Sequence, residues 1–133
     1  MAVDSLHQRI TDNQYDLIIP VPLHRSRRRE RGFNQSEILA RRLADLLHIE
    51  LNTEILKRVR PTTQQARLEE SNRRENVKNA FALTNNRGPS LSGKAILLVD
   101  DIVTTGATIY ETAKPLQSGD PALVDVFCLG YTR

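Results

Sequence analysis

The sequence predicts an α/β fold with a mainly parallel, twisted sheet flanked by helices. Two apolar runs, at residues 17–21 and 95–99, have the length and continuity of buried strands. A helical pattern comes after each run, and strands that alternate with helices are typical of a parallel sheet. The length of 133 residues suits a single domain with its own core, so we expect one domain over 1–133.

The first part of the chain supplies one strand and one helix. Residues 17–21 form the strand, which a proline closes. Asn34 and Glu37 form a capping-box pattern, in which the asparagine side chain accepts from the third helical amide. An amphipathic helix is therefore expected over 35–48. Its leucines at helical spacing are Leu39, Leu43 and Leu46.

The middle of the chain has weaker patterns. Residues 51–59 give a strand candidate, and the polar residues 61–67 are expected to form a loop. Residues 68–79 are compatible with a charged helix, and 80–83 with a short strand. Residues 84–93 have the composition of turns.

The strongest strand of the sequence is residues 94–99, whose continuous apolar run suits a central strand covered on both faces. A helix follows, and Pro115 is expected to kink or shorten it. Gly119 is the expected helix stop, and residues 123–129 form the last strand. The residues expected to share one helix face are Ile109, Ala113 and Leu116.

Charge is unevenly distributed along the chain. The net charge is +3, yet residues 21–80 carry +6, whereas 1–20 carry −2 and 81–133 carry −1. A basic middle segment indicates an anionic partner, either a phosphate ligand or a nucleic acid. The single cysteine, Cys128, excludes an internal disulfide and a cysteine-based zinc site.

No targeting or membrane-spanning segment is visible in the sequence. The first residues lack the apolar core of a signal peptide, and the longest apolar run is too short to cross a bilayer. We therefore expect a cytoplasmic protein without a membrane partner.

Two adjacent carboxylates, Asp100 and Asp101, end the strongest strand. Burying them without polar partners would be costly, so they are expected to meet a polar ligand. The following turn offers hydroxyls, a glycine and the first amides of a helix, which together favour a phosphate. The stretch predicts a site for a phosphorylated sugar; the alternative is that Asp100 and the threonines only cap the helix. The turn residues are Thr104, Thr105, Gly106, Ala107 and Thr108.

Five arginines fall within residues 25–31, directly after the first strand and its prolines. A guanidinium binds phosphate through paired donors, so this segment is suited to a pyrophosphate group. A solvated basic surface is the plain alternative. A further alternative is that the basic segment Arg25–Arg42 binds DNA without sequence specificity.

Residues 96–108 resemble the signature of type I phosphoribosyltransferases that binds 5-phosphoribosyl 1-pyrophosphate (PRPP). The resemblance implies that Asp100 and Asp101 bind the ribose hydroxyls and that Thr104 through Thr108 cradle the 5-phosphate. It also implies Mg²⁺ as the cofactor, held by PRPP itself, with Asp100 and Asp101 reaching it through water and no direct protein ligand.

A narrower resemblance is to the ComF (GntX-like) family of competence-associated proteins. It rests on residues 20–24 and 29–35, on 62–65 and on 73–81, and it covers a core of about 16–130. It implies a pyrophosphate loop and a lid that closes over PRPP; a plain surface helix is the alternative for the lid. The implied loop residues are Leu23, His24, Arg25, Arg29 and Arg31. The implied lid residues are Thr62, Gln65, Arg73 and Arg74.

Most members of that family carry an N-terminal zinc-binding segment with paired cysteines, and this sequence lacks one. A truncated form and a downstream start are both open explanations. The resemblance implies a PRPP-binding protein of DNA uptake and utilisation that transfers phosphoribosyl with release of pyrophosphate. The sequence has no clear hood for an acceptor, so a PRPP or nucleotide sensor that works through competence proteins without turnover is the alternative. A homodimer is expected by the same analogy, and the acceptor and catalytic residues are not identified.

Overall fold

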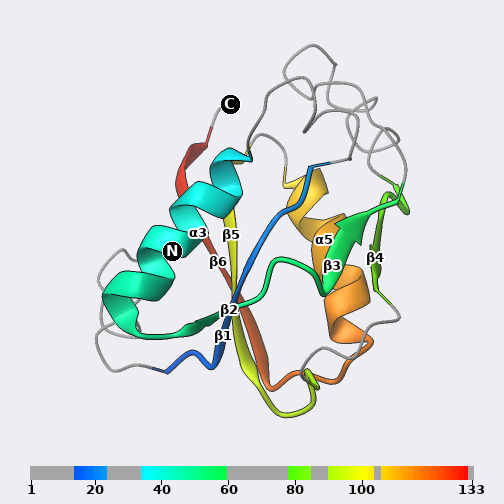
Figure 1. Ribbon diagram of the computed structural model, residues 1–133. Coiled ribbons are helices and arrows are strands. Elements are labelled where there is room, and N and C mark those ends of the chain that lie inside the picture. The colour runs from blue at the N-terminus through cyan, green and yellow to red at the C-terminus, as the bar shows by residue number, and fades with distance from the viewer. Residues whose placement is uncertain (1–13, 24–33, 60–77, 85–89, 104–105, 132–133) are drawn as a thin grey trace.

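The computed structural model describes residues 14–23, 34–59, 78–84, 90–103 and 106–131. Its main sheet has four strands in the order β2-β1-β5-β6, all parallel. The strands are β1 (Leu17–Pro20), β2 (Glu50–Leu51), β5 (Ala95–Val103) and β6 (Leu123–Tyr131). Helix α3 (Gln35–Leu47) covers one face, and α5 (Ala107–Gln117) covers the other (Figure 1). The predicted parallel α/β fold is confirmed.

The two faces of the sheet bury alternate residues of the same strands, as the period of two requires. Leu17 and Ile19 of β1 belong to the core cluster on the α5 side, and Ile18 belongs to the cluster on the α3 side. In β5, Ile96 and Leu98 face the first cluster, and Leu97 and Val99 face the second. Each of these two strands is therefore covered on both faces of the sheet, which is why its sequence is continuously apolar.

Helix α3 begins where the sequence predicts, but two details differ. The Asn34 side chain accepts from the amide of Ser36, the second helical amide and not the third. Leu46 is 76% exposed, because the buried stripe of the helix runs through other, smaller residues. That buried stripe consists of Ser36, Ala40 and Ala44.

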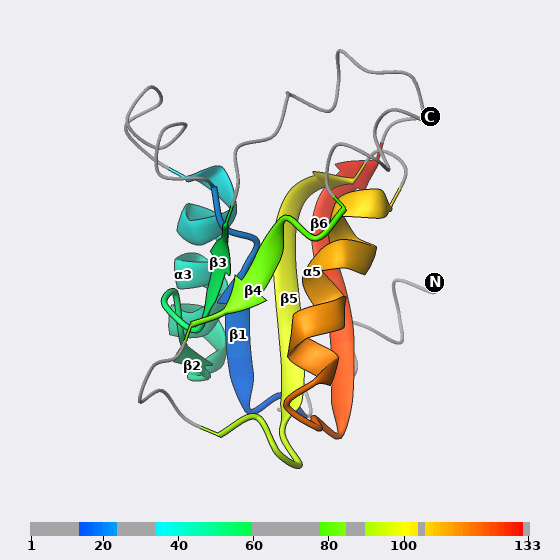
Figure 2. The same cartoon turned by 90° about the vertical axis from the view of Figure 1, so that its right-hand side faces the viewer.

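The single strand predicted over 51–59 is wrong. The segment holds the end of β2 and, separately, β3 (Leu56–Arg58), which pairs antiparallel with β4 (Phe81–Leu83) in a second, two-stranded sheet. Asn52 makes the break, because its side chain accepts from the amides of Glu54 and Ile55. Figure 2 shows β3 and β4 on the same side of the main sheet as α5.

The short strand predicted over 80–83 is confirmed as β4. Most of the predicted loop 61–67 and helix 68–79 lies outside the described residues. The described end of that helix, Lys78 and Asn79, is a turn in which Asn79 has a φ of 54°.

Strand β5 is longer than predicted, since it continues beyond Val99 to Val103 alongside β6. Helix α5 runs through Pro115 and ends at Gln117. Of the predicted face of α5, Leu116 is buried and Ile109 packs partly buried against the core. The other buried residues of the helix are Ala107, Glu111 and Thr112.

Gly119 does not end α5 through a left-handed conformation; Asp120, with a φ of 59°, takes that conformation instead. Gly119 is required for another reason. A Cβ at this position would lie 2.8 Å from the Cβ of Leu91, so only glycine allows the close approach. Within the described residues, no helix is long and apolar enough to cross a membrane.

Candidate functional site

Asp100 and Asp101 lie in the last part of β5, at the carboxyl end of the parallel sheet. Asp100 is 8% exposed. Its Oδ1 atom accepts a hydrogen bond from Ser36 Oγ at 3.1 Å and another from the Asp101 amide at 2.9 Å. The first turn of α3 therefore holds the carboxylate of Asp100 in place.

Asn34 joins the end of β1 to the start of α3. Its Nδ2 donates to the carbonyl of Val21 at 3.1 Å, while its Oδ1 accepts from the Ser36 amide at 3.0 Å. The side chain is 6% exposed, so both bonds are protected from water. Asn34 thus connects Val21, before the arginine-rich segment, with Ser36, after it. It also positions Ser36 for its contact with Asp100.

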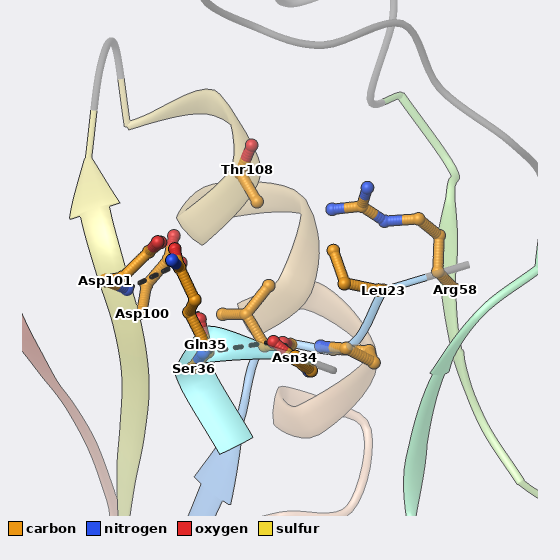
Figure 3. A pocket seen from close by; sticks show the side chains of 10 residues that line it. Leu23, Asn34, Gln35, Ser36, Arg58, Asp100, Asp101 and Thr108 are labelled. Carbon is orange, nitrogen blue, oxygen red and sulfur yellow. Dashed lines mark hydrogen bonds between the residues drawn. The ribbon is translucent and has the colours of Figure 1, made fainter. Parts of the chain in front are cut away.

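The two aspartates line a pocket of about 140 Å³ at this edge of the sheet. Figure 3 shows Thr108, from the first turn of α5, above the two carboxylates. Arg58, from the end of β3, extends its guanidinium toward the pocket from the opposite side. The pocket therefore combines acidic groups on one wall with a cation on the other. The remaining lining residues are Val21, Pro22, Leu23, Asn34, Gln35 and Ser36.

Gly106 is the N-cap residue of α5 and has a φ of 83°. A Cβ built on Gly106 would meet no protein atom within 4 Å, so the space beside the helix start is open. The first intrahelical bond runs from the Tyr110 amide to the Gly106 carbonyl. The positive end of the α5 dipole thus faces open space near the two aspartates, an arrangement that suits an anion.

The environment of Asp100 favours its neutral form. The pKa of Asp100 is raised from 3.8 to about 6, mainly by burial and also by the adjacent Asp101 carboxyl group. The hydrogen bonds from Ser36 and from the Asp101 amide act in the opposite direction. A cation or a donor in the pocket would favour the ionised form.

This pKa shift makes a prediction about stability. The folded protein binds the Asp100 proton more tightly than the unfolded chain does. Protonation of Asp100 therefore stabilises the fold; this stabilisation is complete below pH 4 and is lost as the pH rises through 6. Asp100→Asn removes the titration. Its free energy of unfolding should therefore rise relative to the wild type between pH 4 and 7, by up to about 3 kcal/mol. Urea unfolding of both proteins across this range measures the difference, and two parallel pH profiles would contradict it.

The pocket brings together four of the predicted site residues. Asp100, Asp101 and Thr108 line the pocket with Leu23, and Gly106 lies at the start of α5. Ala107 is the first residue of α5 and is buried. The remaining predicted residues lie outside the described part of the chain: Thr104, Thr105, His24, Arg25, Arg29, Arg31, Thr62, Gln65, Arg73 and Arg74.

Sequence reasoning missed three side chains at this pocket. Ser36 was assigned only to a helix and Arg58 only to a weak strand, and Gln35 supported the family resemblance without being predicted as a site residue. Arg58 is held inward by its contact with the Phe81 ring, whose centroid lies 4.7 Å from the guanidinium carbon. The alternation of Leu56, Lys57 and Arg58 could have placed Arg58 on the inner side with Leu56, since residues two apart share a face of a strand.

Two other chemistries find little support among the described residues. No group of three or more His, Cys, Asp or Glu side chains could hold a metal ion directly in this part of the chain. Cys128 lies on β6 opposite Asp100, and burial followed by the Asp100 charge raises the pKa of its thiol. A thiol with a raised pKa is a poor nucleophile at neutral pH.

Comparison with protein families matches residues 30–132 to the phosphoribosyl transferase domain. The "DNA utilization protein YhgH" of Escherichia coli O157:H7 is 40% identical over 134 residues, which cover 99% of this chain and 57% of that protein. "Competence protein F" of Haemophilus influenzae is 40% identical over 102 residues, covering 77% of this chain and 44% of that protein. The chain thus spans a little over half the length of the first of these relatives.

Among solved structures, the fold is similar to that of a purine phosphoribosyltransferase from Pyrococcus horikoshii. The TM-score is 0.59, the sequence identity is 17%, and the match covers 96% of this chain and 68% of the other. At this identity the likeness concerns the fold alone.

Proposed function

The chain belongs to the phosphoribosyl transferase domain family, in its ComF branch, and from this premise we propose that its pocket binds PRPP together with Mg²⁺. We propose that residues 1–133 act as one domain, with a core over about 16–130. The proposal rests on one observation: Asp100, Asp101 and Thr108, from the first turn of α5, line the same pocket.

The pocket divides naturally between the parts of PRPP. The carboxylates of Asp100 and Asp101 are suited to accept hydrogen bonds from the two ribose hydroxyls. The open space at Gly106, on the positive end of α5, suits the 5-phosphate. Arg58 and the segment that starts at His24 supply cations for the pyrophosphate.

The two carboxylates of the pocket fit a magnesium ion that is held through water. Two adjacent carboxylates suit a hard cation, and Asp100, whose pKa is raised by burial, is a group that a cation would return to its ionised form. Asp100 and Asp101 would hold the ion through water, with PRPP oxygens as its other ligands. When bound, Mg²⁺ supplies charge neutralisation of the pyrophosphate.

The reaction that such a site supports is phosphoribosyl transfer. The lone pair of an acceptor nucleophile forms a bond to C1 of the ribose, and the bond from C1 to the pyrophosphate oxygen breaks with its electron pair. The proton of the acceptor passes to water. Arg58 stabilises the charge that develops on the leaving pyrophosphate, which is the kind of electrostatic contribution that dominates such sites.

The names of the relatives suggest the biological setting. Proteins called DNA utilization protein and competence protein match this chain over most of its length. We propose accordingly that the chain serves DNA uptake or utilisation in the cytoplasm, with competence proteins as partners and with assembly as a homodimer. Non-specific DNA binding through Arg25–Arg42 is a weaker proposal, which salt dependence of binding tests directly.

Calorimetric titration of the protein with PRPP tests the central proposal. PRPP should bind at least about tenfold more tightly with Mg²⁺ than with EDTA, and more tightly than ribose 5-phosphate or pyrophosphate, because each of these fills only part of the pocket. The absence of binding heat with all three compounds would overturn the proposal. If PRPP binds, release of pyrophosphate with a panel of acceptors distinguishes an enzyme from a sensor.

A further inference from the structure

A second pocket lies directly beside the first. It has a volume of about 550 Å³ and lies between α3 and the ends of β5 and β6. Asp101 and Gln35 line both pockets, so a ligand in one is next to a ligand in the other. The other lining residues are Ile38, Leu39, Arg42, Leu129 and Gly130.

The walls of this second pocket are mainly apolar. Ile38 is 43% exposed and Leu129 is 71% exposed, so this pocket presents apolar side-chain surface that a bound ring would remove from water. Gly130 adds open space, because a Cβ there would meet no atom within 4 Å. The volume is within the range of small-molecule sites, and an apolar wall with few polar groups is their usual construction.

Two charged groups of opposite sign lie on this apolar pocket. Arg42, on α3, is exposed and forms no ion pair with any of the residues the structure describes. Its neighbour Arg41, in contrast, lies 4.0 Å from the carboxylate of Glu37. Asp101 lies at the boundary with the first pocket. A ligand with an acidic end toward Arg42 and a ring nitrogen toward Asp101 would contact both groups.

We propose that this second pocket is the acceptor subsite and that it takes a planar heteroaromatic ring bearing a carboxylate. The ring packs against Ile38 and Leu129, its carboxylate pairs with Arg42, and its ring nitrogen faces Asp101 and the ribose. This inference rests on the proposed function. The lone pair of the nitrogen forms the bond to C1 of PRPP, and pyrophosphate leaves with the electron pair of the broken C1–O bond. A pyridine nitrogen becomes a pyridinium and releases no proton, whereas a ring N–H gives its proton to water.

The test uses a panel of pyridine and pyrimidine carboxylates, each with its uncharged amide, titrated into the full chain by NMR. At least one carboxylate should shift the amide signals of Gln35, Ile38 and Gly130, and should bind at least tenfold more tightly than its amide. Arg42→Gln should weaken that carboxylate about tenfold or more, whereas the matched control Arg41→Gln should leave its affinity unchanged. Leu129→Asp should also abolish binding, because it places a negative charge on the apolar wall.

Several results would overturn the inference. One is the absence of binding by any carboxylate, and another is an equal effect of Arg42→Gln and Arg41→Gln. A third is a change from dimer to monomer in Leu129→Asp or Ile38→Asp, measured by light scattering, without effect on ligand binding, since the face would then join two copies of the chain. Parallel titration with PRPP separates the two proposals: carboxylate binding without PRPP binding would leave a ligand site but overturn the acceptor role.

Discussion

PRPP binding should fall at least about 30-fold when Asp100 and Asp101 are both replaced by asparagine. Each carboxylate is proposed to accept a hydrogen bond from a ribose hydroxyl, and asparagine keeps an acceptor oxygen but lacks the charge. A hydrogen bond to a charged group contributes about 1.5–3 kcal/mol and one between neutral groups about 0.5–1.5 kcal/mol, so each replacement costs about 1–1.5 kcal/mol. The two replacements together correspond to a loss of about 30-fold to 150-fold in affinity. Calorimetry of the double variant Asp100→Asn/Asp101→Asn in the presence of Mg²⁺ measures it.

This double variant is designed to keep the fold. Asparagine retains an oxygen that can accept from Ser36 Oγ and from the residue 101 amide, as the Asp100 carboxylate does. Removal of a buried group with a raised pKa should also leave the protein at least as stable at neutral pH. Asp45→Asn, on the exposed surface of α3, is the matched control and should bind PRPP as the wild type does. Full affinity in the double variant would refute the assignment of these carboxylates to the ribose.

Patterns that repeat along the chain predicted most of the fold. The continuous apolar runs of β1 and β5 follow from burial on both faces, so these two strands and their parallel order could be inferred from the sequence. The pair Asp100 and Asp101 was found because two acids after an apolar strand need polar partners. These features depend on residues close together in sequence.

Contacts between distant residues could not be predicted in this way. The bond from Ser36 to Asp100 joins residues 64 positions apart, and neither residue signals the other. Arg58 reaches the same pocket only because β3 pairs with β4 in a separate sheet on the α5 side. Leu46 was misplaced because alanines, which have little hydrophobic signal, form the buried stripe of α3.

Replacing Gly106 by valine should reduce PRPP affinity at least about 100-fold. The space that a side chain would enter holds no protein atom, and the 5-phosphate is proposed to occupy it. Loss of one charge-assisted phosphate contact and displacement of the phosphate from the helix start together account for an effect of this order. Gly106→Ala, with a smaller side chain, should give an intermediate loss in the same calorimetric titration.

Backbone strain is the competing explanation for the Gly106→Val result, and Gly93 separates the two. Gly106 has a φ of 83° and Gly93 a φ of 71°, and a Cβ at either position would meet no atom within 4 Å. A valine therefore costs a similar amount of stability at both sites, about 1–3 kcal/mol. Gly93 precedes β5, at the opposite end of that strand from Asp100. Gly93→Val should thus unfold at a similarly lowered urea concentration yet bind PRPP normally; an equal loss of affinity in both variants would mean that strain, and not the occupied phosphate space, explains the effect.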